Sequence, residues 1–128
     1  MHVTKNDVEV KMQIPGAVVR QRTEFGSVNG FDKISGEYFS LAKGVDTKPL
    51  FVGLEGNVCQ CPHWGYVLSG QVTTTDAKGT KETVKQHDLF YWPPGHNVMV
   101  DADAELIMFS PQREHTMVID HMKKQTGG

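Results

Sequence analysis

The chain has 128 residues, and its 13 Lys and Arg against 15 Asp and Glu give a formal net charge of −2 at pH 7. This length suits one domain with its own hydrophobic core. The nearly balanced charge gives no support for a nucleic-acid partner or an acidic membrane surface. No apolar run is long enough to span a bilayer or to act as a signal peptide. We therefore expect a soluble, cytoplasmic protein.

Short segments rich in β-branched and aromatic residues alternate with turn signals along most of the chain. In the first half these candidate strands are 8–14, 17–23, 37–42 and 50–54, with a loop-like stretch at 26–36. In the second half they are 58–63, 64–68, 71–75, 80–86, 89–92, 97–100 and 105–110. Many short strands at regular spacing predict a β-sandwich or β-barrel.

Several turns separate these strands. Asp76–Gly79 is a good hairpin loop, Ser69-Gly70 predicts a turn or bulge, and Asp101–Ala104 predicts a second turn. His87 is expected to serve a turn, because histidine tolerates a positive φ better than most residues.

Only residues 115–124 have helical character, with Lys123-Lys124 suited to a C-terminal end. Their predicted apolar face consists of Met117, Val118, His121 and Met122. His2, His115 and His121 are expected at the surface or as ordinary helix residues.

Both cysteines of the chain lie in one short segment, and a histidine follows the second by two positions. In an extended strand the side chains of Cys59, Cys61 and His63 would all point the same way. Cysteines in a cytosolic chain indicate free thiols or a metal site before a structural disulfide. The spacing therefore favours metal binding, although a buried cysteine or histidine alone is more often ordinary core.

Two further segments carry a resemblance to a known family. His63–Gly70 has an ionisable residue followed seven positions later by a glycine, and 87–96 contains Asp88 and the turn Pro93-Pro94-Gly95. This order resembles the two-motif signature of the cupin superfamily. The resemblance implies an all-β fold, an antiparallel jelly-roll β-barrel with a short C-terminal helix. The resemblance covers about 37–111, the barrel core of a predicted single domain over 1–128, and it leaves the N-terminal strands and loop at 1–36 and the helix at 115–124 as additions.

The ligand positions of that signature hold unusual residues here. If Gly70 sets the register, His63 falls where cupins carry a glutamate, while Cys59 and Asn57 fall at the two histidines. In the second motif Val98 falls at the usual histidine, and His96 lies two residues before it on the same strand face. The standard ligand set is therefore absent.

This departure leaves two interpretations open. Either the barrel has lost its metal, or the site is rebuilt from Cys59, Cys61, His63 and His96. Thiolate and imidazole ligands favour zinc, with iron, nickel or copper behind it. Four protein ligands would make a structural site, whereas three would leave an open position for chemistry.

Other residues have predicted places around the barrel. Asn57, Val98, Tyr91 and Trp92 are predicted pocket-lining positions, and alternation means that one of Tyr91 and Trp92 faces inward while the other packs elsewhere. Trp64 and Tyr66 have the opposite parity and are expected outside the barrel or at a dimer face. No general acid or base is evident unless Glu37 or Glu55 reaches into the pocket.

Three functions remain open at this point. The first is a metal-dependent enzyme acting on a small molecule in the barrel, such as an isomerase or dioxygenase of the cupin kind. The second is a non-catalytic module that binds a small molecule or senses thiol or metal state, and the third is a structural zinc barrel. By analogy with jelly-roll cupins we also expect a homodimer, in which the segments 8–14 and 17–23 could extend a sheet across the interface.

Overall fold

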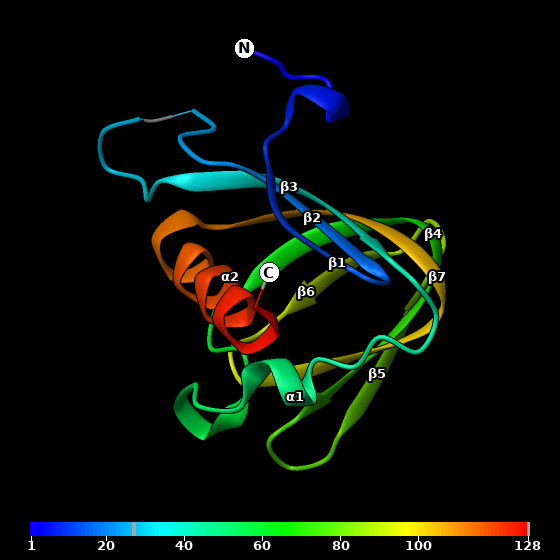
Figure 1. Cartoon of the computed structure of the whole chain (residues 1–128). Coiled ribbons are helices and arrows are strands. Elements are labelled where there is room, and N and C mark those ends of the chain that lie inside the picture. The colour runs from blue at the N-terminus through cyan, green and yellow to red at the C-terminus, as the bar shows by residue number, and fades with distance from the viewer. Residues whose placement is uncertain (27, 128) are drawn as a thin grey trace.

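The computed structural model describes residues 1–26 and 28–127, and it is built mainly from antiparallel strands. Within this part the sheet has seven strands in the order β1-β2-β3-β7-β4-β5, and β6 pairs with β4 (Figure 1). The strands are β1 (Val10–Ile14), β2 (Ala17–Arg22), β3 (Ile34–Leu41), β4 (His63–Asp76), β5 (Lys81–Lys85), β6 (Leu89–Trp92) and β7 (His96–Pro111). The helices are α1 (Lys48–Phe51) and α2 (Gln112–Thr126), with 3-10 turns η1 (Lys5–Asp7) and η2 (Glu55–Asn57). The predicted all-β fold class with a C-terminal helix is confirmed.

The two longest strands, β4 and β7, pair with each other along most of their length. They pair from Trp64↔Phe109 at one end to Asp76↔His96 at the other. The first part of β4 also pairs with β6 and its second part with β5, so the sheet curves around the core. Figure 1 shows α1 and α2 side by side across one side of this curved sheet.

A bulge at Gly70 lets β4 run continuously where the sequence predicted a turn or bulge. The register against β7 shifts on both sides of Ser69, and Gly70 has a φ of +86°. A Cβ at Gly70 would lie 2.1 Å from the carbonyl oxygen of Asp103. The predicted turn at Asp101–Ala104 is wrong, because this segment is strand within β7 and pairs with β4 instead.

Two strand predictions before β4 are also wrong. Residues 50–54 contain the end of helix α1, which Pro49 favours because proline fits the first turn of a helix. The segment 58–63 is not a strand, because β4 begins only at His63. Cys59 makes an isolated bridge to His96, and Pro62 removes a backbone donor from the intervening chain.

Helix α2 is longer than the predicted 115–124, and its buried face includes Val118 and Met122 as predicted, but not Met117 or His121. Its buried residues are His115, Val118, Ile119 and Met122, at the spacing i, i+3, i+4 and i+7 of an apolar helix stripe. Met117, predicted for that face, is 62% exposed. Neither helix of the described residues is long and apolar enough to cross a membrane.

Candidate metal centre

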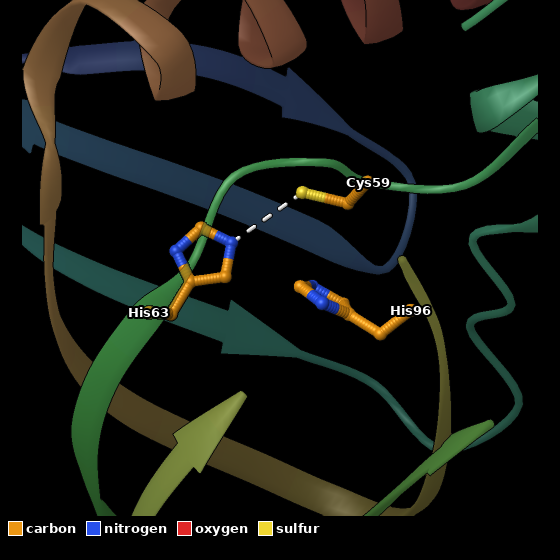
Figure 2. Close-up of side chains that lie close together, drawn as sticks. All are labelled: Cys59, His63 and His96. Atoms are coloured by element: carbon orange, nitrogen blue, oxygen red, sulfur yellow. Dashed lines mark hydrogen bonds between the residues drawn. The ribbon is translucent and has the colours of Figure 1, made fainter. Parts of the chain in front are cut away.

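Cys59, His63 and His96 converge inside the barrel from three separate points of the backbone (Figure 2). His63 is the first residue of β4, His96 is the first residue of β7, and Cys59 lies in the loop that precedes β4. The Cys59 backbone N–H donates to the His96 carbonyl at 2.9 Å, and the His96 N–H donates back to the Cys59 carbonyl at 3.2 Å. This bridge fixes the loop against β7, which brings the thiol to the two imidazoles.

The three side chains are close enough to share one ion. Their candidate ligand atoms lie within 4.8 Å of one another, and Cys59 Sγ is 3.5 Å from His63 Nε2. The imidazole centroids of His63 and His96 are 5.3 Å apart. All three residues are buried, with at most 4% of their surface exposed. A thiol and two imidazoles gathered in this way form a donor set suited to a transition-metal ion.

The proton on His63 is fixed by a buried chain of hydrogen bonds. Ser110 Oγ donates to Glu37 Oε1 at 2.8 Å, so its single proton is already committed. His63 Nδ1 lies 2.6 Å from the same Ser110 Oγ, which can then only accept. His63 therefore carries its proton on Nδ1, and the lone pair on Nε2 points toward Cys59.

His96 has the same tautomer for a similar reason. Its Nδ1 lies 2.7 Å from the backbone carbonyl oxygen of Pro93, and a carbonyl can only accept. The proton is therefore on Nδ1, and Nε2 is left free. Metal-binding histidines usually donate their other ring N–H to a carbonyl or carboxylate in this way, which orients the ring and fixes the tautomer.

Burial controls the protonation of all three candidate ligands. It lowers the pKa of His63, with the neighbouring His115 and His96 adding to the effect, and it lowers the pKa of His96. Burial also raises the pKa of the Cys59 thiol to about 12, although a hydrogen bond with the backbone of Cys61 opposes the shift. At neutral pH both imidazoles are thus ready to bind an ion, whereas the thiol must first lose its proton.

Behind His63 lies a buried carboxylate that gathers four donors. Ser35 Oγ donates to Glu37 Oε2 at 2.7 Å, Gln21 Nε2 donates at 3.3 Å, and Ser110 Oγ donates to the other oxygen. His115 Nδ1 lies 2.5 Å from Glu37 Oε2, and its ring centroid is 4.3 Å from that of His63. A carboxylate that orients a histidine is a common arrangement for proton transfer.

The prediction that His115 is a surface or ordinary helix residue is wrong, because only 2% of it is exposed. The helical spacing of His115 with Val118, Ile119 and Met122 was the sequence signal that could have placed it on the buried face. The sequence named Glu37 only as a carboxylate that could reach the pocket. Its buried partners on β3, β7 and α2 hold it behind His63 and His115, outside the lining of the cavity.

A cavity of about 50 Å³ lies next to the three candidate ligands. The residues with polar side chains in its lining include Cys59, His63, His96, His115 and Thr47, and the ring of Trp92 also lines it. Its other walls are mostly apolar and include Val19, Phe39, Leu41, Val98, Leu106 and Met108. The cavity is therefore an apolar chamber with its nitrogen and sulfur donors gathered in part of the wall, as in many small-molecule sites.

No family model and no curated protein matches the sequence. Solved structures do match. An RmlC-like cupin from Shewanella frigidimarina is similar at a TM-score of 0.59 and 16% identity, over 89% of this chain and 93% of that one. The polyketide cyclase RemF from Streptomyces resistomycificus is similar at a TM-score of 0.57 and 20% identity, over 87% of this chain and 78% of that one. KdgF from Halomonas sp. is similar at a TM-score of 0.52 and 15% identity, over 88% of this chain and 94% of that one.

The chain has a cupin fold. At these identities the likeness establishes the fold alone, so the site has to be judged from its own residues. Of the residues at the cupin signature positions, Cys59, His63 and Val98 are buried and line the cavity inside the barrel, whereas Asn57 is exposed.

Cys61 lies apart from the candidate centre. Its thiol is within hydrogen-bonding distance of the carbonyl oxygens of Pro62 and Pro111, at 3.4 and 3.9 Å. The prediction that Cys61 joins Cys59 and His63 assumed an extended strand with alternating faces. The chain around Pro62 is not strand, so that alternation does not apply. Burial raises the pKa of the Cys61 thiol, which keeps it protonated.

The four predicted pocket-lining residues divide into two pairs. Trp92 and Val98 line the cavity. Asn57 does not, because it is exposed and its Oδ1 accepts from the Gly53 backbone N–H at 3.0 Å. Tyr91 does not either, because it is 49% exposed and stacks on Trp64 at 5.3 Å on the outer face of the barrel.

Proposed function

We propose that this cupin binds one divalent metal ion through Cys59, His63 and His96. The observation that carries the proposal is the contact of both Nδ1 atoms with oxygen atoms of Ser110 and Pro93, which directs the two Nε2 lone pairs to the side of the thiol in a buried site. Zinc suits this donor set best, with iron, nickel or copper behind it. When bound, such an ion supplies Lewis acidity or lowers the pKa of a bound water.

The same arrangement favours an open site over a structural one. Three protein ligands leave a coordination position free, whereas structural zinc sites use four. Cys61, the fourth ligand that the sequence suggested, contacts backbone carbonyls instead. The adjoining cavity leaves room for a small molecule beside the centre. Two free buried thiols suit the reducing cytoplasm.

We further propose that the protein acts on its ligand as an enzyme of the isomerase or dioxygenase kind. Supporting this, His115 lines the cavity and is oriented by Glu37, so it offers a group that holds or moves a proton. One structural neighbour, RemF, is a polyketide cyclase by name. The alternative is a barrel that binds or senses without turnover. Loss of turnover but not of ligand binding in a His115→Gln variant supports the enzyme, whereas absence of turnover in the wild type under all conditions supports the sensor.

Elemental analysis of purified protein tests the metal proposal. Wild type grown with zinc, iron, nickel and copper supplied should hold about one ion per chain, and His63→Ala, His96→Ala and Cys59→Ser should each lose it. Cys61→Ser is the matched control, because it makes the same change at an equally buried thiol outside the donor set. Unchanged metal content in the first three variants would show that the site is wrong.

We also propose that two copies associate through an outer aromatic face, defined here as Trp64, Tyr91, Phe109, Phe31 and Val28. These residues are between 42% and 79% exposed. Trp64 stacks on Tyr91 and lies opposite Phe109 in the register of β4 and β7, while Val28 and Phe31 adjoin them in a shared groove.

The exposed area of this face fits a dimer of moderate size. An aromatic side chain offers about 150–250 Å² when fully exposed. The outer aromatic face therefore exposes several hundred Å² of apolar surface, which is more than half of the roughly 800 Å² that each partner buries in a standard interface, and polar rim residues would supply the rest. Light scattering should give twice the 14.3 kDa chain mass for wild type and a monomer for Trp64→Glu. A monomeric wild type at high concentration would refute the association.

A further inference from the structure

The indole nitrogen of Trp92 is a buried donor without a partner. Among the described residues it is the one buried side-chain nitrogen or oxygen that makes no hydrogen bond, and Trp92 is only 2% exposed. Buried polar groups are nearly always hydrogen-bonded, because leaving one unpaired costs free energy. The unpaired indole N–H of Trp92 therefore indicates a hydrogen-bond partner that is present when the protein has its ligand bound.

Trp92 lies where such a partner would bind. It lines the cavity beside the candidate centre, and its ring centroid is 5.8 Å from that of His96 and 6.3 Å from that of His63. Phe90 packs against the same ring at 4.2 Å and holds it in place. An indole N–H can only donate, so its partner must be a hydrogen-bond acceptor.

We propose that the Trp92 indole N–H binds an oxygen of the cavity's ligand, and that this ligand is a short monocarboxylate or a monoanion of the same shape. Trp92 then determines specificity by recognising an oxygen acceptor. The charge part of this inference rests on the proposed function, because it counts the charge of a bound divalent ion.

Charge selects a monoanion. No lysine or arginine is found among the described residues that line the cavity, so without an ion the site has nothing to neutralise an anion. The Glu37 carboxylate is already paired with His115 and with serine hydroxyls. A divalent ion bound by one thiolate and two neutral imidazoles leaves a net charge of +1. One negative charge on the ligand balances it, and a dianion such as phosphate would leave an excess charge buried.

Size selects a short chain. The cavity volume is about 50 Å³, and a cavity of roughly 150 Å³ is known to admit benzene. The apolar walls, including Val19, Leu106 and Met108, suit a small alkyl group more than a second polar one. Acetate satisfies both limits, whereas benzoate is too large and phosphate carries too much charge.

The test uses zinc-loaded protein and the chain's two tryptophans, Trp64 and Trp92. Acetate is titrated into wild type, Trp92→Phe and Trp64→Phe by calorimetry, with zinc content measured in each sample. Phenylalanine keeps most of the ring and removes the N–H, and Trp64 is the matched control because it lies on the outer face. In the Trp64→Phe protein the fluorescence comes from Trp92 alone, so it reports acetate binding with the tested residue intact.

We expect acetate to bind wild type and Trp64→Phe equally, with a change in Trp92 fluorescence, and to bind Trp92→Phe about 10-fold to 100-fold more weakly. Phosphate and benzoate should bind wild type at least tenfold more weakly than acetate. If zinc content is normal but acetate does not bind, or binds Trp92→Phe as well as wild type, the role of Trp92 is overturned. If wild type holds no zinc, the metal proposal fails instead, and the choice of a monoanion fails with it.

Discussion

Replacing Ser110 by alanine should weaken zinc binding although Ser110 does not contact the ion. The Ser110 hydroxyl is fully buried, donates to Glu37 Oε1 at 2.8 Å and accepts from His63 Nδ1 at 2.6 Å. Without it, the proton of His63 is no longer directed to Nδ1, and the tautomer with a free Nε2 loses its support. Partners of this kind typically contribute 10-fold to 100-fold to metal affinity.

The expected loss for Ser110→Ala is therefore about 1.4–2.7 kcal/mol of zinc-binding free energy. The variant also leaves the His63 N–H and one oxygen of Glu37 without a partner in the core. Each such group costs about 1–3 kcal/mol, so the free energy of unfolding of the metal-free protein should fall as well. Competition with a chromophoric zinc chelator at pH 7.5 measures the affinity, and urea unfolding measures the stability.

Ser35→Ala is the matched control for this prediction. Ser35 is equally buried and donates to the other oxygen of Glu37 at 2.7 Å, but its hydroxyl has no contact with His63. It should lower the free energy of unfolding while leaving zinc affinity within about twofold of wild type. Equal zinc affinity in wild type and Ser110→Ala, or an equal loss in the two serine variants, would refute the tautomer argument.

Three further predictions concern pH and backbone strain. Zinc affinity should rise about tenfold per pH unit between pH 7 and 9, because only the Cys59 thiol, with a pKa of about 12, must lose a proton; calorimetry showing a flat profile would contradict this. The pKa values of His63 and His96 are lowered in the folded protein, so the unfolded chain binds more protons below their ordinary pKa of 6.5. Urea unfolding of the metal-free protein should therefore give its highest free energy of unfolding above pH 6.5. Below pH 6.5 that free energy should fall by up to about 1.4 kcal/mol per pH unit for each histidine. An equal free energy of unfolding at pH 7 and pH 5.5 would refute this. Gly70→Ala should lower the midpoint of thermal unfolding more than Gly79→Ala, because both have a positive φ but only Gly70 has backbone at 2.1 Å from a Cβ; equal shifts would show that crowding is not the cause.

Local patterns were sufficient for the fold class. Alternating segments and turn residues predicted a β-barrel, and the spacing from His63 to Gly70 with Pro93-Pro94-Gly95 pointed to a cupin, which the structure comparisons support. The hairpin at Asp76–Gly79 lies between β4 and β5 as expected. Local signals failed where pairing with a distant strand prevailed, as at Asp101–Ala104, which β4 holds in strand conformation.

For the candidate site, the sequence by itself supplied the candidate ligands, which are the two cysteines and the histidines at 63 and 96. Only the tertiary structure decided which of them meet. It separates Cys61 from Cys59, because the chain between them is not extended, and it brings in Glu37 and His115. These two residues are 78 positions apart in sequence. Their contact depends on how α2 packs against the sheet, and no local pattern encodes that long-range packing.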